Sequence, residues 1–304
     1  MAQGVINTSQ IAHLMRPGVK GFVTRSERYN SQYKELFKTE SSDKQSEIFV
    51  EMQLLGQANF KPQGDSLTFD GMAELFTTSI VAATIATGFV ITLEAVQDDL
   101  YKDIWPKGSQ SIIDACNQLK ETTGANVLTN AFSGTLQTLA DGQPFASTVH
   151  PLGVGGSFSN TFSISTTLNE TSLEDMDIGI QQFVDAGGLR QHIKSELLVV
   201  PPQLKFQAER LMESKFRTGT TTNDISSTNR LNTIGAGYTV NQFLSNPNLY
   251  ALKTSQEGMI HLKRIPLDID VNSDPDTFNI KVRGYERWSF GVYNARSAFI
   301  SQGS

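Results

Sequence analysis

Alternating apolar and polar residues predict a long β-hairpin in the first third of the chain. From residue 47 to residue 54 every second position is apolar, the set being Ile48, Val50, Met52 and Leu54. Period-two alternation is typical of a strand with one apolar face. A stretch containing Gly and Pro follows at 57–65, and alternation resumes at 66–70. The segment 46–80 is therefore predicted to be two strands joined by a polar tip that carries Lys61.

Two segments carry apolar residues at the spacing of an amphipathic helix. The first is predicted from Ser109 to Gly124, because serine caps a helix start and glycine suits the left-handed residue after its end. Its apolar stripe is Ile112, Ala115, Cys116 and Leu119. The second is predicted to open at Ser172 and to stop at Gly187–Gly188, with acidic residues that complement the helix dipole. Its apolar face is Leu173, Met176, Ile180, Phe183 and Val184.

The N-terminal segment 1–45 is mostly polar and holds one amphipathic piece. A helix capped by Ser26 would place four apolar residues on one face, namely Tyr29, Tyr33, Leu36 and Phe37. A helix in a polar arm has little nearby in the sequence to pack against. We therefore expect this arm and the hairpin to contact neighbouring subunits and to make few contacts with their own core.

A continuous apolar run, Leu197–Val200, leads directly into Pro201 and Pro202. Such a run predicts a buried strand, and proline suits the first turn of the helix that follows, where no N–H is required. After a polar loop at 218–232, alternation returns between residues 278 and 292. Helices mixed with antiparallel-type strands, without regular βαβ units, predict an α+β fold.

Composition narrows the class of protein. The chain has 304 residues, 38% of them hydrophobic and 18% charged, which is typical of a globular protein with one or two domains. A net charge of −6 argues against tight nucleic-acid binding, which requires a basic surface. The single cysteine, Cys116, excludes an intrachain disulfide and a cysteine-based zinc site. We expect no signal peptide, and the most apolar run, 79–96, is too polar to span a membrane.

Candidate catalytic and metal-binding residues are present but do not form a motif. The four histidines, His13, His150, His192 and His261, lack the H-x-x-x-H spacing that places two ligands on one helix face. The glycine-containing stretches 105–109 and 153–157 lack the order of a phosphate-binding loop, so we interpret both as turns. Ser31 and Lys34 match the S-x-x-K pattern of acyl-enzyme hydrolases, but the companion motifs are absent.

Charged pairs offer no better candidate. Asp98–Asp99 and the pair Asp268 and Asp270 are expected on solvated faces and turns, because nothing else converges on them. Three arginines in the C-terminal part, Arg283, Arg287 and Arg296, have carboxylates or a phosphate as alternative partners. We therefore expect no catalytic, cofactor-binding or metal-binding residues, and a protein that offers surfaces for assembly.

The C-terminal segments resemble the closing strands of the major capsid proteins of tailed bacteriophages. The similar segments are Glu257–Leu262, Phe278–Arg283 and Glu286–Ile300. Leu198–Leu204, L-V-V-P-P-Q-L, is similar to the strand-to-helix junction of that family's axial domain. The resemblance implies the tailed-phage capsid fold. Its parts would be an N-terminal arm (1–45), an extended hairpin or E-loop (46–80), a peripheral domain with a long spine helix (81–135), an axial domain (136–256) and return strands completing the peripheral domain (257–304).

The resemblance also implies a function. The chain would self-assemble into hexamers and pentamers of an icosahedral head that encloses double-stranded DNA, after synthesis in the bacterial cytoplasm. Its partners would be further copies of itself, portal, scaffolding and decoration proteins, and DNA held without sequence preference, but no membrane. Encapsulin shells share this fold and are one alternative, and a tail component is another. A soluble hydrolase using Ser31 and Lys34 is the third, and it would require a deep pocket.

Some capsid proteins of this kind join their subunits by an isopeptide bond between a hairpin-tip lysine and an asparagine, beside a buried glutamate. Lys61 and Asn279 have the matching places here, but Tyr285 stands where the glutamate is expected. Glu286 should point to the opposite face of its strand, because side chains alternate. A tyrosine with a pKa of about 10 is a poor base at neutral pH, so we expect shells held by non-covalent contacts.

Overall fold

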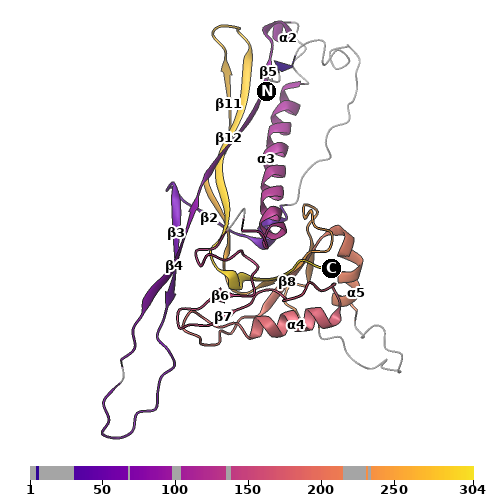
Figure 1. Cartoon of the computed structure of the whole chain (residues 1–304). Helices are drawn as coiled ribbons and strands as arrows, with labels where there is room; N and C mark the ends of the chain where they lie inside the picture. Colours follow the sequence, from indigo (N-terminus) through magenta and orange to yellow (C-terminus); the bar gives the residue numbers. More distant parts are fainter. Residues whose placement is uncertain are drawn as a thin grey trace.

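The computed structural model describes residues 5–6, 31–67, 69–97, 104–134, 138–214, 231 and 234–304. It shows an elongated body built on two larger sheets, from which a long hairpin extends to one side (Figure 1). Several residues singled out above lie outside the described residues, namely His13, Ser26, Tyr29, Asp98, Asp99 and most of the loop 218–232.

The first sheet has five strands in the order β1-β5-β12-β11-β2. Its centre is the antiparallel pair β11 (Met259–Ser273) and β12 (Ile280–Val292), which forms a long two-stranded ribbon. The strand β5 (Ala83–Ile91) is antiparallel to β12, whereas β1 (Val5–Ile6) and β2 (Lys38–Ser41) run parallel to their neighbours at the two edges. The predicted alternation at 278–292 is thus confirmed as a strand.

The helix α3 (Ile104–Thr129) lies along β12 and β5 (Figure 1). Ile112 and Cys116 are buried against Val282 of β12, as the predicted stripe requires. The predicted end at Gly124 is wrong, because this glycine lies inside the helix. A Cβ added there would stand 3.2 Å from the Cβ of Tyr33, so the small residue serves close packing and not a helix stop.

Three further details of α3 differ from the prediction. The segment 105–109, interpreted as a turn, belongs to the helix, and so does the predicted cap Ser109. Leu119 is exposed, because the buried face turns toward Glu121, Ala125 and Leu128 further along. These residues face α1 and the second sheet, which the local spacing does not reveal.

The helix α1 (Tyr33–Leu36) and the strand β2 belong to the chain's own core. Tyr33, Leu36 and Phe37 are buried, and the rings of Tyr33 and Phe37 pack edge-to-face on Phe290 with centroids 5.5 and 4.8 Å apart. The prediction that the arm makes few contacts with its own core is therefore wrong for residues 33–41. The partner, β11, lies more than 200 residues later in the sequence, so no local pattern indicated it.

The second sheet has four strands in the order β13-β10-β8-β9. They are β13 (Ala298–Ser301), β10 (Tyr250–Thr254), β8 (Ser195–Val200) and β9 (Tyr238–Val240). On β8, Leu198 and Val200 face the cluster that contains α4 and α5, and Leu197 and Val199 face the core shared with α3. Burial on both faces explains the continuous apolar run and confirms the predicted strand.

The helices α4 (Glu170–Gln181) and α5 (Lys205–Met212) cover this sheet. Pro201 and Pro202 introduce a 3₁₀ turn, η1 (Pro202–Leu204), which leads into α5 as expected. The helix α4 starts earlier than predicted, because Asn169 is its cap and Ser172 donates back to the Asn169 carbonyl from the first turn. It ends at Gln181, before the predicted glycine stop.

The last strand, β13, pairs with β10 in the second sheet. The capsid resemblance implied that all of residues 257–304 would return to the first sheet. Only β11 and β12 do so, and β13 joins the second sheet. A three-residue 3₁₀ turn, η3 (Ala295–Ser297), carries the chain from β12 to β13. A boundary at residue 257 consequently does not separate the two sheets.

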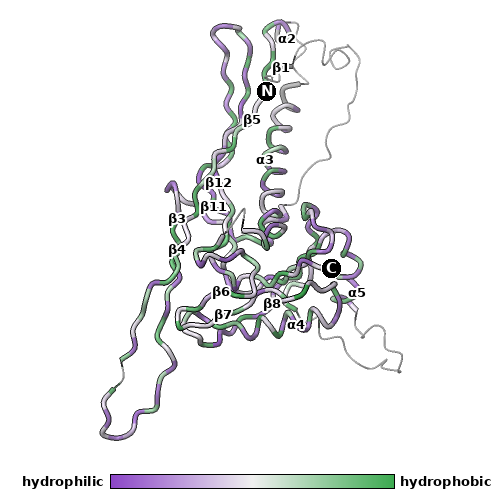
Figure 2. Tube along the Cα trace, viewed as in Figure 1, coloured by the Kyte–Doolittle hydropathy of each residue, from purple (hydrophilic) through white to green (hydrophobic). Residues whose placement is uncertain are grey.

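The predicted hairpin is present as β3 (Ser46–Gln53) and β4 (Ala73–Val81), with Ser46 opposite Val81. Green and purple segments alternate along it (Figure 2). The predicted strand at 66–70 is wrong, because the described residues between Leu54 and Met72 contain no strand. Instead, the Asp70 carboxylate accepts the N–H of Gly56 at 2.7 Å and closes the base of the loop.

Two small elements complete the described chain. The pair β6 (His150–Pro151) and β7 (Ser157–Phe158) is joined by a tight turn with Gly155 and Gly156 at positive φ, which confirms the interpretation of 153–157. The short helix α2 (Leu93–Gln97) follows β5.

Candidate assembly surfaces

The three histidines that the structure describes do not converge. His150 lies in β6, His261 in β11 and His192 in an exposed segment before β8. Among the residues that the structure describes, no group of three His, Cys, Asp or Glu side chains could hold a metal ion.

Ser31 and Lys34 do not form a catalytic pair. The Ser31 carbonyl accepts the N–H of Lys34 at 3.3 Å in the turn that opens α1, which is a backbone contact. The Lys34 side chain is exposed, so its ammonium group is solvated. An acyl-enzyme mechanism needs a desolvated or hydrogen-bonded amine beside the nucleophile, so this arrangement gives no support to hydrolysis.

The arginines find carboxylates. The Arg283 Nη2 atom lies 2.7 Å from Asp270 Oδ2 across the β11–β12 ribbon, and Arg296 Nη1 lies 2.7 Å from Glu51 Oε1. Of the two alternatives left open by the sequence, carboxylate pairing is therefore the one observed for these two arginines. Arg287 differs, because its Nε atom is buried without a hydrogen-bond partner within the described part of the chain.

A groove of about 800 Å³ lies between α4 and the segment before β8. Its carboxylates include Asp177, whose oxygens accept the Ser195 hydroxyl at 2.5 Å and the Gln181 amide at 2.7 Å. The first bond joins α4 to β8 and the second lies within α4, so both oxygens of Asp177 have structural partners.

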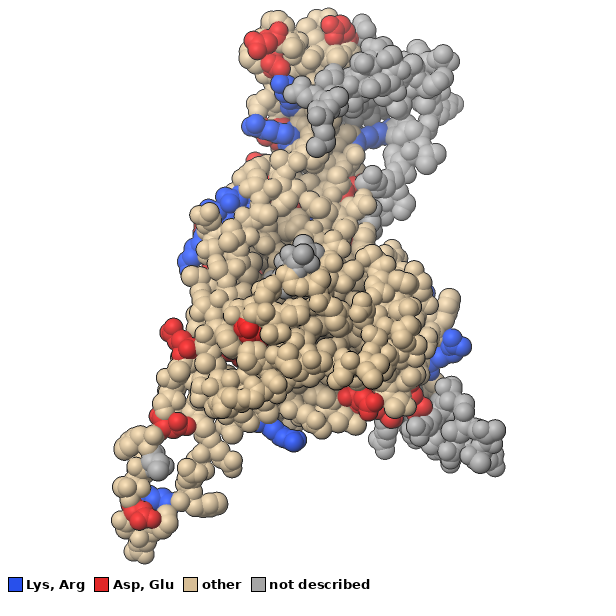
Figure 3. All heavy atoms as spheres, in the orientation of Figure 1, with Lys and Arg blue, Asp and Glu red and all other residues tan. Residues whose placement is uncertain are grey.

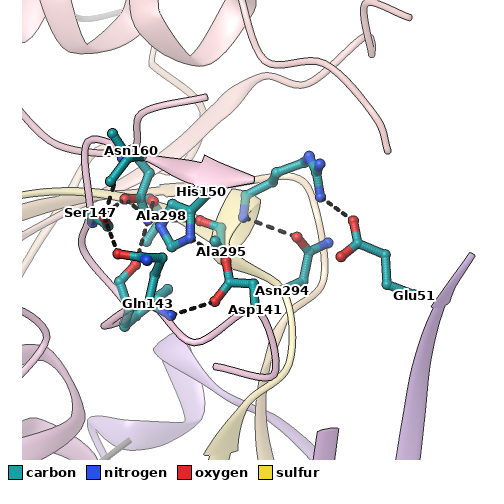
Figure 4. A network of polar contacts seen from close by, with 12 residues as sticks. Glu51, Asp141, Gln143, Ser147, His150, Asn160, Asn294, Ala295 and Ala298 are labelled. Carbon is teal, nitrogen blue, oxygen red and sulfur yellow. Dashed lines mark hydrogen bonds and ion pairs between the residues drawn. The ribbon is translucent and has the colours of Figure 1, made fainter. Parts of the chain in front are cut away.

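A buried hydrogen-bond network centres on Asn160 (Figure 4). Its amide nitrogen donates to the Ala295 carbonyl at 3.0 Å, and its oxygen accepts the Ser147 N–H at 2.9 Å and lies 3.2 Å from His150 Nε2. His150 Nδ1 lies 2.7 Å from Asp141 Oδ2. An Asp–His pair resembles part of a catalytic triad, but both ring nitrogens face protein atoms and the ring is completely buried. The pair is therefore structural, and Asn160 joins His150 of β6 to Ala295 in the β12–β13 connection.

Buried charges beneath α3 are also structural. The Glu121 carboxylate accepts the Tyr33 N–H at 3.1 Å and anchors the start of α1. Burial raises the pKa of Glu121, and this backbone hydrogen bond opposes the rise. Burial lowers the pKa of His261 to about 4, aided by the charges of Lys120, Lys263 and Lys34. These groups hold α1, α3 and β11 together, and none lines a cleft described above.

The hairpin presents an exposed apolar face. The side chains of Ile48, Val50 and Met52 point to solvent, whereas Phe49 and Glu51 face the body of the chain. Alternation alone predicted the strand correctly but did not reveal that its apolar face has no partner among the described residues. The described part of the tip adds exposed large apolar residues, including Phe60, Leu67 and Phe69. Contiguous exposed apolar side chains mark a surface for protein contact.

The charged side chains on the face shown in Figure 3 form no comparable patch. On the face shown in Figure 3, lysines and arginines are scattered among acidic residues, and much of the middle of the body is uncharged. A continuous basic stripe, which tight nucleic-acid binding requires, is not seen on this face. None of the helices in the described chain has the length and apolar character needed to cross a membrane.

Comparison with known proteins agrees with a shell-forming subunit. The phage capsid protein family model matches residues 74–301, three-quarters of the chain. No curated protein matches the chain. The chain is 13% identical to the capsid protein of Myoviridae phage XM1, with a TM-score of 0.57 over 100% of both chains. It is 15% identical to the mature capsid protein of bacteriophage PhiM1, with a TM-score of 0.57 over 92% of this chain and 89% of the other.

A virus-like particle from Pyrococcus furiosus is similar as well, with 10% identity and a TM-score of 0.51 over 90% of this chain and 92% of that chain. At these identities the solved structures show a shared α+β capsid fold, while the family model covers most of both sheets and β4 of the hairpin. The chain therefore belongs to the phage capsid protein family and is a structural subunit of a virion shell that contains many copies of it.

Proposed function

We propose that the chain assembles into hexamers and pentamers of an icosahedral phage head that encloses double-stranded DNA. The observation that carries this proposal is the hairpin, which extends from the body (Figure 1) and whose apolar side chains Ile48, Val50 and Met52 are exposed. A closed shell needs heterologous contacts that repeat around rings, and a projecting arm with an unpartnered apolar face supplies such a contact.

The parts of the subunit follow from this arrangement. The hairpin, 46–81, is the E-loop that reaches a neighbour, and α3 is the spine helix of a peripheral unit that contains the first sheet. The second sheet with α4 and α5 is the axial unit, whose loops meet at the centre of each ring. The strand β13 belongs to this axial unit, which moves its boundary relative to the one expected at residue 257.

Burial of the apolar hairpin face supplies a driving force for assembly. Each large apolar side chain contributes about 1.5–3 kcal/mol when it is fully buried. Three such side chains on β3, repeated in every subunit, favour association over dispersed monomers. The net charge of −6 fits a container that contacts its DNA loosely and without sequence preference.

Further partners belong to the same proposal. A phage head of this kind is assembled in the bacterial cytoplasm with a portal and scaffolding proteins, and decoration proteins bind its outside. The family match favours a phage head over an encapsulin-type shell and over a tail component.

Microscopy of the purified chain tests the proposal. We expect wild-type protein to form closed shells in negative stain, with five-fold and six-fold rings in a reconstruction. The double variant Ile48→Asp and Met52→Asp should yield folded subunits that form no shells, because it places charges in the apolar contact. The matched control, Ile48→Val and Met52→Leu, keeps the face apolar and should assemble. Shells formed by the Asp variant would contradict the role of this face.

A further inference from the structure

Arg296 lies where the two sheets meet. It belongs to η3, the turn that carries the chain from β12 of the first sheet to β13 of the second. Its side chain is only 6% exposed. The backbone is fixed as well, because its N–H donates to Asn294 Oδ1 at 3.0 Å and its carbonyl accepts the Thr254 hydroxyl at 2.6 Å.

The guanidinium group of Arg296 is held in place by residues next to the second sheet, in β7 and after α4. Its Nε atom donates to the Val184 carbonyl at 2.6 Å, in the segment that follows α4. The Cζ atom of the guanidinium lies over the ring of Phe158 in β7, 4.4 Å from the ring centre. A planar guanidinium fixed at two places presents its remaining N–H groups in a defined direction.

That direction leads to the hairpin. Arg296 Nη1 lies 2.7 Å from Glu51 Oε1, and Figure 4 shows Glu51 reaching toward the network from β3. Glu51 occupies the face of β3 opposite to the exposed apolar face, and its side chain is 32% exposed. The ion pair therefore connects the body to the back of the surface proposed to bind a neighbour.

The hairpin is irregular at this residue. Val50 pairs with Thr77 and Met52 pairs with Glu74, so two residues of β4 stand opposite Glu51. Such a β-bulge bends a hairpin and redirects a side chain. The bulge and the ion pair thus coincide at the same place along β3.

Apolar contacts also hold the base of the hairpin, where Ile80 of β4 is buried against Ile260 and Leu262 of β11. The rings of Phe49 and Tyr293 are stacked with centroids 4.3 Å apart and planes 7° from parallel. Stacked rings tolerate sliding, whereas a charge-assisted hydrogen bond to a fixed guanidinium is directional. The apolar contacts therefore attach the hairpin, whereas the ion pair adds a directional contact between the hairpin and the body.

We propose that Arg296 is a positioning residue that sets the angle at which the hairpin leaves the body. Because Val184 and Phe158 hold the guanidinium, the orientation of the hairpin depends on the position of the segments that carry these two residues. The angle in turn decides where the apolar face meets the next subunit. This last consequence rests on the proposed assembly function, but the hold on the hairpin does not.

Hydrogen exchange on the full chain in its unassembled form tests the hold directly. Glu51→Ala should increase the opening equilibrium of β3 and β4 on the order of tenfold, because it removes a charge-assisted hydrogen bond. Glu74→Ala is the matched control, since it removes an exposed acid from the same hairpin. Glu74→Ala should leave exchange in β3 and β4 unchanged. Neither variant should change exchange in β8 and β10. Wild-type exchange in the Glu51→Ala hairpin would overturn the proposal.

Arginine geometry gives a second arm. Arg296→Lys keeps the positive charge but cannot bond Val184 and Glu51 at the same time, so it should also loosen the hairpin. If Arg296→Lys matches the wild-type protein in hairpin exchange, the directional role of the guanidinium is wrong.

Particle uniformity tests the consequence for assembly. Glu51→Ala should give shells with a broader distribution of diameters than wild-type or Glu74→Ala shells. Uniform shells of wild-type diameter, together with faster hairpin exchange, would overturn the link to assembly and leave the hold on the hairpin established. Failure of the wild-type chain itself to form shells would overturn the proposed function, and the exchange result would still decide the role of Arg296.

Discussion

Lys120 of α3 and Glu286 of β12 form an ion pair of 2.6 Å beneath the helix, and only 1% of the Glu286 side chain is exposed. The other carboxylate oxygen accepts the Trp288 Nε1–H at 2.7 Å. The carboxylate is therefore bonded on both sides, and the pair fixes the helix to the first sheet at a point where apolar packing alone would allow it to slide.

Lys120→Met should destabilise the subunit by about 3–5 kcal/mol, because it leaves Glu286 buried without its cation. The free energy of unfolding, measured with urea on unassembled subunits, checks this. Lys281→Met breaks the more exposed pair of Lys281 and Asp274 and should change that free energy very little. Equal effects of the two substitutions would contradict the structural role of the buried pair.

His261 should make the subunit less stable in acid. Burial lowers its pKa from 6.5 to about 4, so the folded state binds fewer protons than the unfolded state between these values. The stabilisation is complete above pH ~6.5 and decreases as the pH falls toward 4, by about 3 kcal/mol in total.

A phenylalanine at position 261 isolates this contribution. His261→Phe keeps a ring against Phe290, whose centroid lies 4.6 Å away, but cannot take up a proton. Its free energy of unfolding should fall less steeply than that of the wild type between pH 6.5 and 4. The control His192→Phe alters an exposed ring and should retain the wild-type slope. Identical slopes for all three proteins would refute the assignment.

Leu198→Asp should abolish soluble shells. Leu198 is completely buried in β8, facing α4 and α5, so the substitution buries an unpaired charge at a cost of several kcal/mol, on the order of the whole stability margin. Yield of soluble protein and particle counts by microscopy measure the effect. Glu196→Asp, at an exposed position on the same strand, is the control and should assemble normally.

Mature shells should be held together by non-covalent contacts. Tyr285 is partly exposed and Glu286 is buried on the opposite face, where its carboxylate is already bonded to Lys120 and Trp288. Boiling purified particles in denaturant and reductant should therefore give one band near the 33.4 kDa chain mass. A ladder of multimers that survives this treatment would show a covalent bond between subunits.

The elements with a continuous local pattern could be predicted from the sequence. The apolar run before Pro201 predicted β8, and the alternation of apolar and polar residues predicted β3 and β12. Boundaries failed where a distant partner decides the conformation. Gly124 continues a helix because it packs against Tyr33, which is 91 residues earlier in the chain.

The candidate surface could be predicted only in part. The sequence indicated that the hairpin extends toward a neighbour, and its exposed Ile48 and Val50 agree with that expectation. The roles of Phe37 and Arg296 could not be deduced, because each contacts residues far away in sequence: Phe290 in one case and Glu51 in the other. Spacing along the chain contains no information about such pairs.

The pairing of β5 with β12 also fixes the order in which a new chain can fold. Nearly 190 residues separate Ile91 from Ile280, its partner in the sheet. At about 5–20 residues per second, a ribosome needs roughly 10–40 s to synthesise that interval. The hairpin strands β3 and β4 are close in sequence and pair with each other, so they need not wait. The hairpin that we propose to reach another copy is thus made first, while the first sheet still lacks its central strands, β11 and β12.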